Sequence, residues 1–215
     1  MDNIEERIPL PVTVRVAPEE YLSLELRAHE LLRDVPLYDV SVVDLPGGGN
    51  GRSLADALHL QAAAPRSLVE RTLYGVRHAL GRAFGWDEGR LLPEDSLVYR
   101  LSEKDRRDSE IVPGTPNGAF QVVYRFRNEQ LSEIRNATVQ GYVCIALSPR
   151  SSGYRYYFAV YVIPVSWLTR PYLALIEPFR RFLLYPAMLR RLRNAWQAAY
   201  GEVVERPKIP RVPPV

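Results

Sequence analysis

The segment 167–200 carries apolar residues at helical spacing over a longer stretch than any other part of the chain. One apolar residue recurs at every seventh position: Leu168, Leu175, Phe182, Leu189 and Trp196. A stripe of this kind is typical of a helix that lies on a hydrophobic core. Pro178 and Pro186 lie inside the pattern, and each removes an intrahelical hydrogen bond, so we expect a bent or divided helix.

Between residues 96 and 164 the pattern changes to the alternation of apolar and polar residues that β-strands show. It predicts five strands, at 96–101, 119–127, 130–138, 139–147 and 154–164. Asn128-Glu129 and the segment 148–153 are short enough to be hairpin connections, which predicts an antiparallel sheet. An earlier strand, YDVSVVDL, is predicted at 38–45.

The remaining segments are predicted from their prolines, caps and apolar spacing. They are an extended arm or edge strand at 1–17, a helix at 18–33, a short helix at 53–60, a longer helix at 65–85 and a charged loop or ragged edge strand at 104–116. Ser53 and Asp56 form a capping pattern at the start of the short helix. The tail 201–215 is too rich in proline to pack as a helix.

This order of elements predicts an α+β fold with two helices between the first and second strands. An antiparallel sheet with one apolar face must be covered on that face, and the long C-terminal helix is the natural cover. We divide the chain into an N-terminal arm and helix at 1–37, one domain at 38–200 and the tail at 201–215.

The same order resembles the helix-grip architecture of START-like, birch-allergen-like and polyketide-cyclase-like proteins (the SRPBCC superfamily), in which a curved antiparallel sheet grips a long C-terminal helix. The stretch TRPYLALIEPFRRFLLYPAMLRR and the preceding VYRFRNEQLSEIRNATV also resemble a bacterial family, domain of unknown function 2867. The block 172–181 and the ending 188–191 carry that resemblance, which covers roughly residues 38–200. The resemblance implies a cavity between sheet and helix, and it implies no particular activity.

Composition and charge bear on the class of protein, its partners and its location. Hydrophobic residues make up 47% and charged residues 25% of the 215 residues, which are ordinary values for a globular protein. The net charge of +3 is mild and the basic residues are spread along the chain, so we expect no nucleic-acid partner. The N-terminus lacks the basic and apolar blocks of a signal peptide, which favours a cytoplasmic protein.

Catalytic and metal-binding motifs are sparse. Cys144 is the one cysteine, and a buried hydrophobic role is the simplest for it. His29, His59 and His78 are far apart and none has a second ligand at helical spacing, so we predict no metal site and no cofactor.

The strands and the long helix supply the residues expected to line the cavity. Pockets of this kind are mostly apolar with a few placed polar groups. The candidate ligand-binding residues are Tyr99, Tyr124, Phe126, Glu133, Arg135, Asn136, Tyr161 and Phe179. The competing interpretation of Glu133 and Arg135 is a solvated same-face ion pair.

These features favour a binding module for a small hydrophobic or amphipathic molecule. One alternative is a cyclase- or dehydratase-type enzyme acting on a polyketide-like or lipid-like substrate, with pocket Tyr, Glu or Arg side chains as acid and base. The other is a peripheral membrane module or a homodimer that uses the basic helix face. That face holds Arg170, Arg180, Arg181, Arg190, Arg191 and Arg193.

Overall fold

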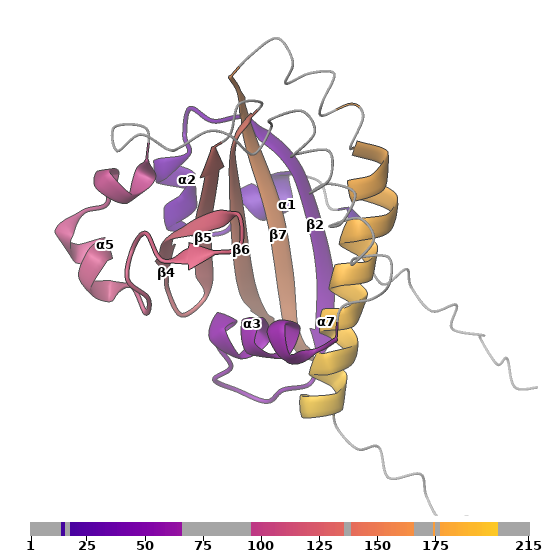
Figure 1. Cartoon of the computed structure of the whole chain (residues 1–215). Coiled ribbons are helices and arrows are strands. Elements are labelled where there is room, and N and C mark those ends of the chain that lie inside the picture. The colour runs from indigo at the N-terminus through magenta and orange to yellow at the C-terminus, as the bar shows by residue number, and fades with distance from the viewer. Residues whose placement is uncertain are drawn as a thin grey trace, which may run out of the picture.

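The structure of the chain is a computed structural model that describes residues 14–15, 18–65, 96–135, 139–165, 174 and 177–201. Figure 1 shows a curved sheet with a long helix along one side. The elements in order are β1 (Val14–Arg15), α1 (Pro18–Leu22), α2 (Arg27–Leu31), β2 (Leu37–Pro46), α3 (Leu54–Ala63), η2 (Leu97–Arg100), α5 (Glu103–Asp108), β3 (Pro116–Asn117), β4 (Phe120–Arg125), β5 (Glu129–Arg135), β6 (Val139–Arg150), β7 (Gly153–Pro164), η3 (Arg180–Leu184) and α7 (Tyr185–Tyr200).

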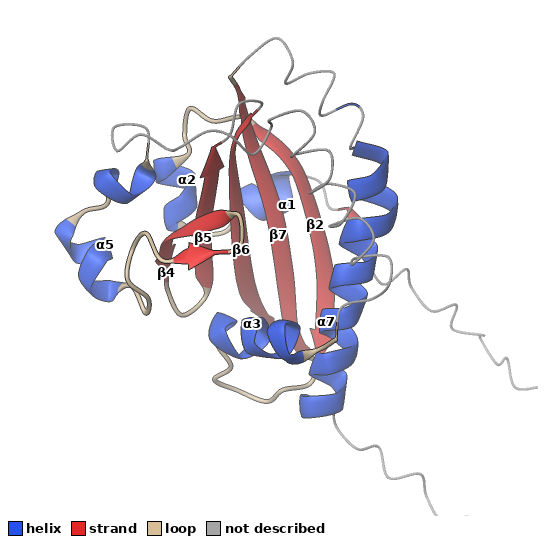
Figure 2. Ribbon diagram, viewed as in Figure 1, coloured by secondary structure: helices blue, strands red, loops and turns tan. Residues whose placement is uncertain are grey.

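The strands form one seven-stranded sheet in the order β1-β2-β7-β6-β5-β4-β3, with antiparallel neighbours throughout. Hairpins join β4 to β5, β5 to β6 and β6 to β7, and β2 pairs with the last strand, as Figure 2 shows. The predicted α+β class, the antiparallel sheet and the C-terminal helix are therefore confirmed.

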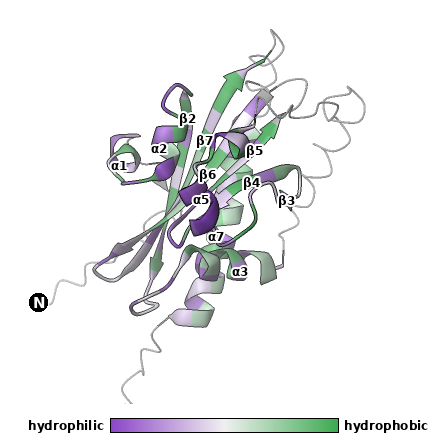
Figure 3. Cartoon of the chain, turned by 90° about the vertical axis from the view of Figure 1, so that its left-hand side faces the viewer, coloured by the Kyte–Doolittle hydropathy of each residue, from purple (hydrophilic) through white to green (hydrophobic). Residues whose placement is uncertain are grey.

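Both faces of the sheet are covered, and we name each face by the helix that packs on it. On the α7 face the side chains of α3 and α7 pack on alternate strand residues, namely Val43, Leu45, Ile145, Leu147, Tyr154 and Tyr156. On the α1 face the segment 21–32 and η2 pack on the intervening residues, which include Val40, Val42, Tyr124, Leu131, Tyr142, Cys144, Tyr157 and Tyr161. Figure 1 shows α1 behind the strands, and Figure 3 shows the alternation of hydrophilic and hydrophobic residues along them.

The long helix is irregular just before Pro186. Pro186 has no N–H to offer the Phe182 carbonyl, and the Tyr185 N–H bonds instead to the Arg180 carbonyl five residues back. This π turn inserts an extra residue, so the seven-residue stripe does not continue through it. Leu189 and Trp196 are fully buried, whereas Phe182 is 67% exposed. The described helix continues from residue 177 to 200 through Pro178 and Pro186 with this π turn inside it, so it is not divided at either proline. The predicted burial of Phe182 is wrong.

The N-terminal part differs from the predicted single helix at 18–33. It forms α1 and α2 with a break at residues 23–26, where the Ser23 hydroxyl donates to the Glu20 carbonyl at 2.8 Å. Such a local bond competes with helix continuation. Val14 pairs with Val42, so the described part of the arm is an edge strand, as predicted.

Two further segments differ from their predictions because side chains cap them. Residues 96–101 were expected as a strand, but they form the 3-10 helix η2, whose start is capped by the Ser96 hydroxyl. The segment expected as a loop or edge strand contains α5, which begins with a capping box of Ser102 and Asp105. Figure 3 shows α5 in the purple of hydrophilic residues.

The loop after β2 is shaped by the long helix. The predicted capping box of Ser53 and Asp56 is confirmed at the start of α3. Gly48 has φ +91°, and a Cβ there would lie 2.8 Å from Trp196 Cζ2, so this position requires glycine. Beyond Pro65, the helix predicted at 65–85 lies outside the described residues, as does the tail after Gly201.

Candidate functional site

The candidate residues of the sheet lie on the α1 face and not under α7. Tyr124 and Tyr161 belong to the hydrophobic cluster on that face, with Phe126 packed against it. Glu133 pairs with Tyr142, and Tyr142 pairs with Tyr161, so these three form one row across the strands. A site built from them therefore lies between the sheet and the N-terminal helices, on the opposite side from the predicted cavity.

The other candidates are scattered. Phe179 lies before the π turn and is 50% exposed, and Tyr99 lies on η2 and is 66% exposed. The Arg135 side chain and Asn136 lie outside the described residues. Of the candidates, the structure brings Tyr124 and Phe126 together, with ring centroids 4.4 Å apart.

Glu133 is fully buried, and the interpretation of it as a solvated residue is wrong. Its carboxylate accepts hydrogen bonds from the Ser96 hydroxyl, from the Leu97 N–H at 2.9 Å and from Gln121 Nε2 at 2.7 Å. These donors hold η2 against β4 and β5. Because both carboxylate oxygens are occupied, Glu133 is a structural tether for η2.

A second polar group lies in the middle of the α1 face, and we call it the central cluster. It consists of Tyr21, His29, Tyr124, Glu129, Cys144 and Tyr161, each from a different element. The strand register explains the convergence, because Tyr124 pairs with Leu131 and Leu131 pairs with Cys144, which places these positions in adjacent rows on one face.

Glu129 supplies the carboxyl group in the middle of this cluster and is 3% exposed. The Arg27 N–H donates to its Oε1 at 2.8 Å. Its Oε2 and the Tyr124 hydroxyl, which lie beside each other, are buried without a hydrogen bond of standard geometry among the described residues. Burial raises the pKa of Glu129, although the N–H groups of Arg27 and Ala28 oppose that rise. Burial likewise raises the pKa of Tyr124 well above its usual value.

The remaining members surround this pair. The Tyr161 hydroxyl donates to the Tyr21 hydroxyl at 3.3 Å, and the Cys144 thiol lies beside Tyr21. His29 packs edge-on against Tyr21 with ring centroids 5.0 Å apart. Both His29 ring nitrogens are buried without a partner of standard geometry in the described chain, and burial lowers the pKa of His29.

Burial in the central cluster disfavours charged side chains. Its tyrosines hold their protons, and burial favours uncharged His29 and the protonated form of Glu129. Buried polar atoms are almost always hydrogen-bonded in native proteins, and leaving one unsatisfied costs about 1–3 kcal/mol. Among the described residues, buried atoms of His29, Tyr124 and Glu129 lack a hydrogen bond of standard geometry, although the Tyr124 hydroxyl lies beside Glu129 and the backbone of Tyr21 and Leu24 lies beside His29.

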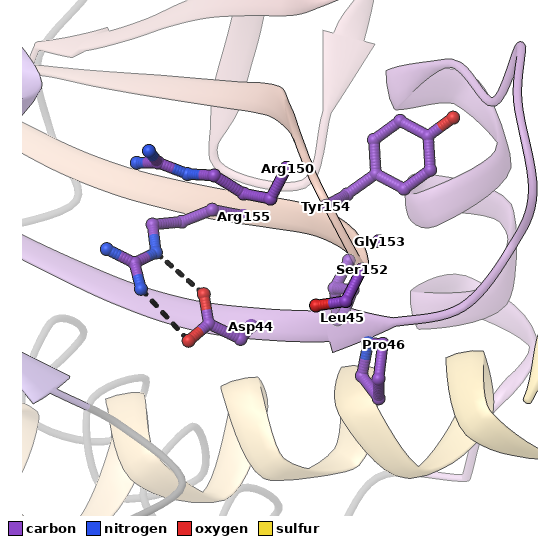
Figure 4. Close-up of a pocket in the computed structure, with 8 residues that line it drawn as sticks. All are labelled: Asp44, Leu45, Pro46, Arg150, Ser152, Gly153, Tyr154 and Arg155. Atoms are coloured by element: carbon purple, nitrogen blue, oxygen red, sulfur yellow. Dashed lines mark hydrogen bonds and ion pairs between the residues drawn. The ribbon is translucent and has the colours of Figure 1, made fainter.

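A hollow of about 240 Å³ lies at the β6–β7 hairpin, shown in Figure 4. Its lining is Asp44, Leu45, Pro46, Arg150, Ser152, Gly153, Tyr154 and Arg155. Arg155 makes two bonds to Asp44, and Glu20 Oε1 accepts from Arg150, Arg155 and Tyr157, each at 2.8 Å. Because both arginines already have carboxylate partners, this network ties α1 to the sheet, and it is a weaker ligand site than the central cluster.

The described residues contain no group of three or more His, Cys, Asp and Glu side chains placed to hold a metal ion. In the same part of the chain, no helix combines the length and the apolar character needed to cross a bilayer. Cys144 is buried and unpaired with another cysteine, as predicted, and burial raises the pKa of its thiol.

Sequence reasoning missed four members of the central cluster. Glu129 was assigned to a turn, but it is the first residue of β5, and alternation from Glu133 would have placed it on the same face. His29 and Tyr21 come from helices that sequence alone does not position over the sheet. For Cys144 the sequence indicates only that the residue is buried in a strand.

The chain belongs to the DUF2867 family, described as a protein family of unknown function, which matches residues 31–187. The match runs from the end of α2 to the beginning of α7 and includes β2 to β7. It confirms the family resemblance seen in the sequence. No curated protein and no solved structure is similar enough to this chain to count as a match.

Proposed function

We propose that this protein binds a small, neutral, amphipathic molecule on the α1 face of a helix-grip fold. The proposed architecture is supported by the element order and by the pairing of β2 with β7, which places the first long strand beside the last. The observation that carries the binding proposal is that His29, Tyr124 and Glu129 hold buried polar atoms without a hydrogen bond of standard geometry in the described part of the chain.

The chemistry of the central cluster defines the class of ligand. Glu129 Oε2 and the Tyr124 hydroxyl can hydrogen-bond a hydroxyl or carbonyl group. Phe126, Leu131 and Leu97 belong to the same hydrophobic layer and suit an apolar body. A formal charge on the ligand would be desolvated without a counterion, so the site disfavours it.

The layer beneath α7 fits the ligand less well. There Leu189, Leu192 and Trp196 are fully buried against the sheet. The Trp196 indole N–H donates to the Pro46 carbonyl at 3.2 Å, so the polar atom of this layer is satisfied. These contacts favour a structural role for that layer.

The test is binding of Nile red, a neutral solvatochromic dye, together with native mass spectrometry of the protein purified from cells. Tyr124→Phe removes a hydroxyl that can donate to the dye carbonyl, and it should weaken dye binding about tenfold, the effect of losing one good hydrogen bond. The matched control is Tyr156→Phe, which removes a buried hydroxyl from the α7 face and should bind like the wild type.

Two results would contradict the proposal. One is equal loss of binding in Tyr124→Phe and Tyr156→Phe. The other is a wild-type protein that neither binds the dye nor carries a small molecule after purification.

Acid–base catalysis of the cyclase or dehydratase type is the second candidate, and one observation favours it. Glu129 has a raised pKa, one oxygen fixed by the Arg27 N–H and the other oxygen beside the Tyr124 hydroxyl. A carboxyl poised in this way can take a proton from carbon next to a carbonyl and deliver a proton to a departing hydroxyl, releasing water. Turnover of β-hydroxyacyl thioester probes that is abolished in Glu129→Gln would support it, and turnover that survives this substitution would exclude Glu129 as the base.

A further inference from the structure

The segment just before α7 exposes three large apolar side chains. Phe179 is 50%, Phe182 67% and Leu183 44% exposed. They are three and four residues apart, and we call them the exposed ridge. Large apolar side chains gathered on one helical turn are unusual on a protein surface that contacts only water.

The π turn holds this ridge outward, because the inner side of the turn is anchored. Arg180 Nε donates to the Tyr185 hydroxyl at 2.7 Å, and its guanidinium lies 5.3 Å from the centre of the Tyr38 ring. Tyr185 is in turn buried against Phe158 of β7. These contacts hold the inner side of the turn that carries the ridge against the sheet.

The surroundings of the ridge are positively charged. The Arg181 guanidinium lies 5.2 Å from the centre of the Phe182 ring, and Arg190 is exposed on the next turns of the helix. Glu177 is the one acidic residue in the sequence from 167 to 200, and it lies 3.9 Å from Arg180. A partner that fits this surface combines an apolar layer with negative charge.

We propose that the exposed ridge docks the protein on an anionic lipid membrane. Phenylalanine and leucine beside arginine are typical of helices that lie in the membrane interface, where the apolar side chains enter the acyl boundary and the arginines contact lipid phosphates. The ridge exposes on the order of 300 Å², well below the roughly 800 Å² per partner that a stable protein interface buries. Its area thus suits shallow insertion into lipid better than a dimer.

Co-sedimentation with vesicles tests this proposal. The full chain should bind vesicles of equal parts phosphatidylcholine and phosphatidylserine at low salt, and it should bind phosphatidylcholine alone much less. Phe179→Ser with Phe182→Ser should reduce binding to anionic vesicles about tenfold or more, since each lost aromatic side chain removes buried apolar area. Arg181→Gln with Arg190→Gln should lower binding to the anionic vesicles and leave the weak binding to neutral vesicles unchanged.

The matched control is Leu22→Ser with Val112→Ser, which removes two exposed apolar side chains outside the ridge, 50% and 75% exposed. This variant should bind like the wild type, and all variants should keep the wild-type melting curve because the altered side chains are exposed. The proposal is overturned if the wild type does not bind anionic vesicles, or if the control loses as much binding as the ridge variant. It is also overturned if the chain forms a dimer that the ridge substitutions dissociate while vesicle binding is absent.

Discussion

The two faces of the sheet are built from the same strands but differ in how fully their buried polar groups are hydrogen-bonded. On the α7 face the Trp196 indole, the Tyr154 hydroxyl and the Tyr156 hydroxyl each have a partner in Pro46, Gly49 and Gln61. On the α1 face His29, Tyr124 and Glu129 keep buried atoms without a hydrogen bond of standard geometry to any residue that the structure describes. Buried polar atoms that are hydrogen-bonded stabilise the fold, whereas buried atoms without a partner cost stability and keep the capacity to bond a ligand. This contrast favours a structural role for the α7 face, and it is the basis on which we propose binding on the α1 face.

The largest effect is expected from Trp196→Ala on the α7 face. Trp196 is fully buried against Tyr154 and Gly48, so its removal leaves a large cavity and should cost about 4 kcal/mol of unfolding free energy. Urea denaturation measures this. Phe182→Ala on the exposed ridge is the control and should change stability by no more than about 0.5 kcal/mol. A cost below about 1 kcal/mol for Trp196→Ala would show that α7 is not the principal cover of this face.

Glu133→Ala should destabilise the α1 face by about 3 kcal/mol, because it leaves the donors of Ser96, Leu97 and Gln121 without their acceptor. Glu133→Gln keeps an acceptor oxygen and should cost less. Hydrogen exchange of the Leu97 amide should speed up in Glu133→Ala. An unchanged exchange rate there would contradict the role of Glu133 as the tether of η2.

Glu129→Gln should change how stability depends on pH. Since the pKa of Glu129 is raised in the folded protein, stability should fall as pH rises above the usual carboxyl value of 4.5 and level off once the folded carboxyl has ionised. The Gln variant should lack this fall and be more stable than the wild type by about 1 kcal/mol at pH 7.

At lower pH, two other carboxyls should make stability depend on pH in the opposite direction. This difference in sign distinguishes their contribution from that of Glu129. Burial opposes the ionisation of Glu20, but hydrogen bonds from Arg155 and Tyr157 lower its pKa. Bonds from Ser102 and Arg27 do the same for Asp105. Both carboxyls stabilise the fold above their unfolded pKa and lose that contribution as pH falls. A wild-type curve without the fall above pH 4.5 would contradict the buried state of Glu129.

The smallest effect is expected for Arg155→Gln at the edge of the sheet. Arg155 joins Glu20 to Asp44, but the network is partly exposed and screened by salt. We expect a loss of about 0.5–1 kcal/mol that shrinks at high salt. A loss as large as that for Glu133→Ala would mean that this partly exposed network stabilises the fold as much as the buried tether of η2 does.

The sequence predicted most of the sheet, because alternation and hairpin turns are local signals. The strands β2, β4, β5, β6 and β7 and the α3 capping box agree with prediction. The predictions for η2 and α5 were wrong because a side-chain cap starts a helix in each segment, whereas the residue composition resembles that of a strand. Phe182 was misplaced because a π turn shifts helical phase by one residue, and spacing alone does not reveal that shift.

The site was harder to predict because it depends on the strand register and on where the first helices pack. Tyr124, Glu133 and Tyr161 share a face as adjacent strands require, but that face is turned away from α7. Glu129 meets the first residue of α2 only when that helix lies over β5, which no local pattern encodes.

The central claim, that the ligand binds the α1 face, is tested most directly by fluorine NMR of the protein labelled with fluorotyrosine and titrated with Nile red. Signals are assigned with single Tyr→Phe variants. We predict that the resonances of Tyr21, Tyr124 and Tyr161 shift on addition of the dye while those of Tyr154 and Tyr156 stay unchanged. Shifts confined to Tyr154 and Tyr156 would place the ligand beneath α7 and contradict the account.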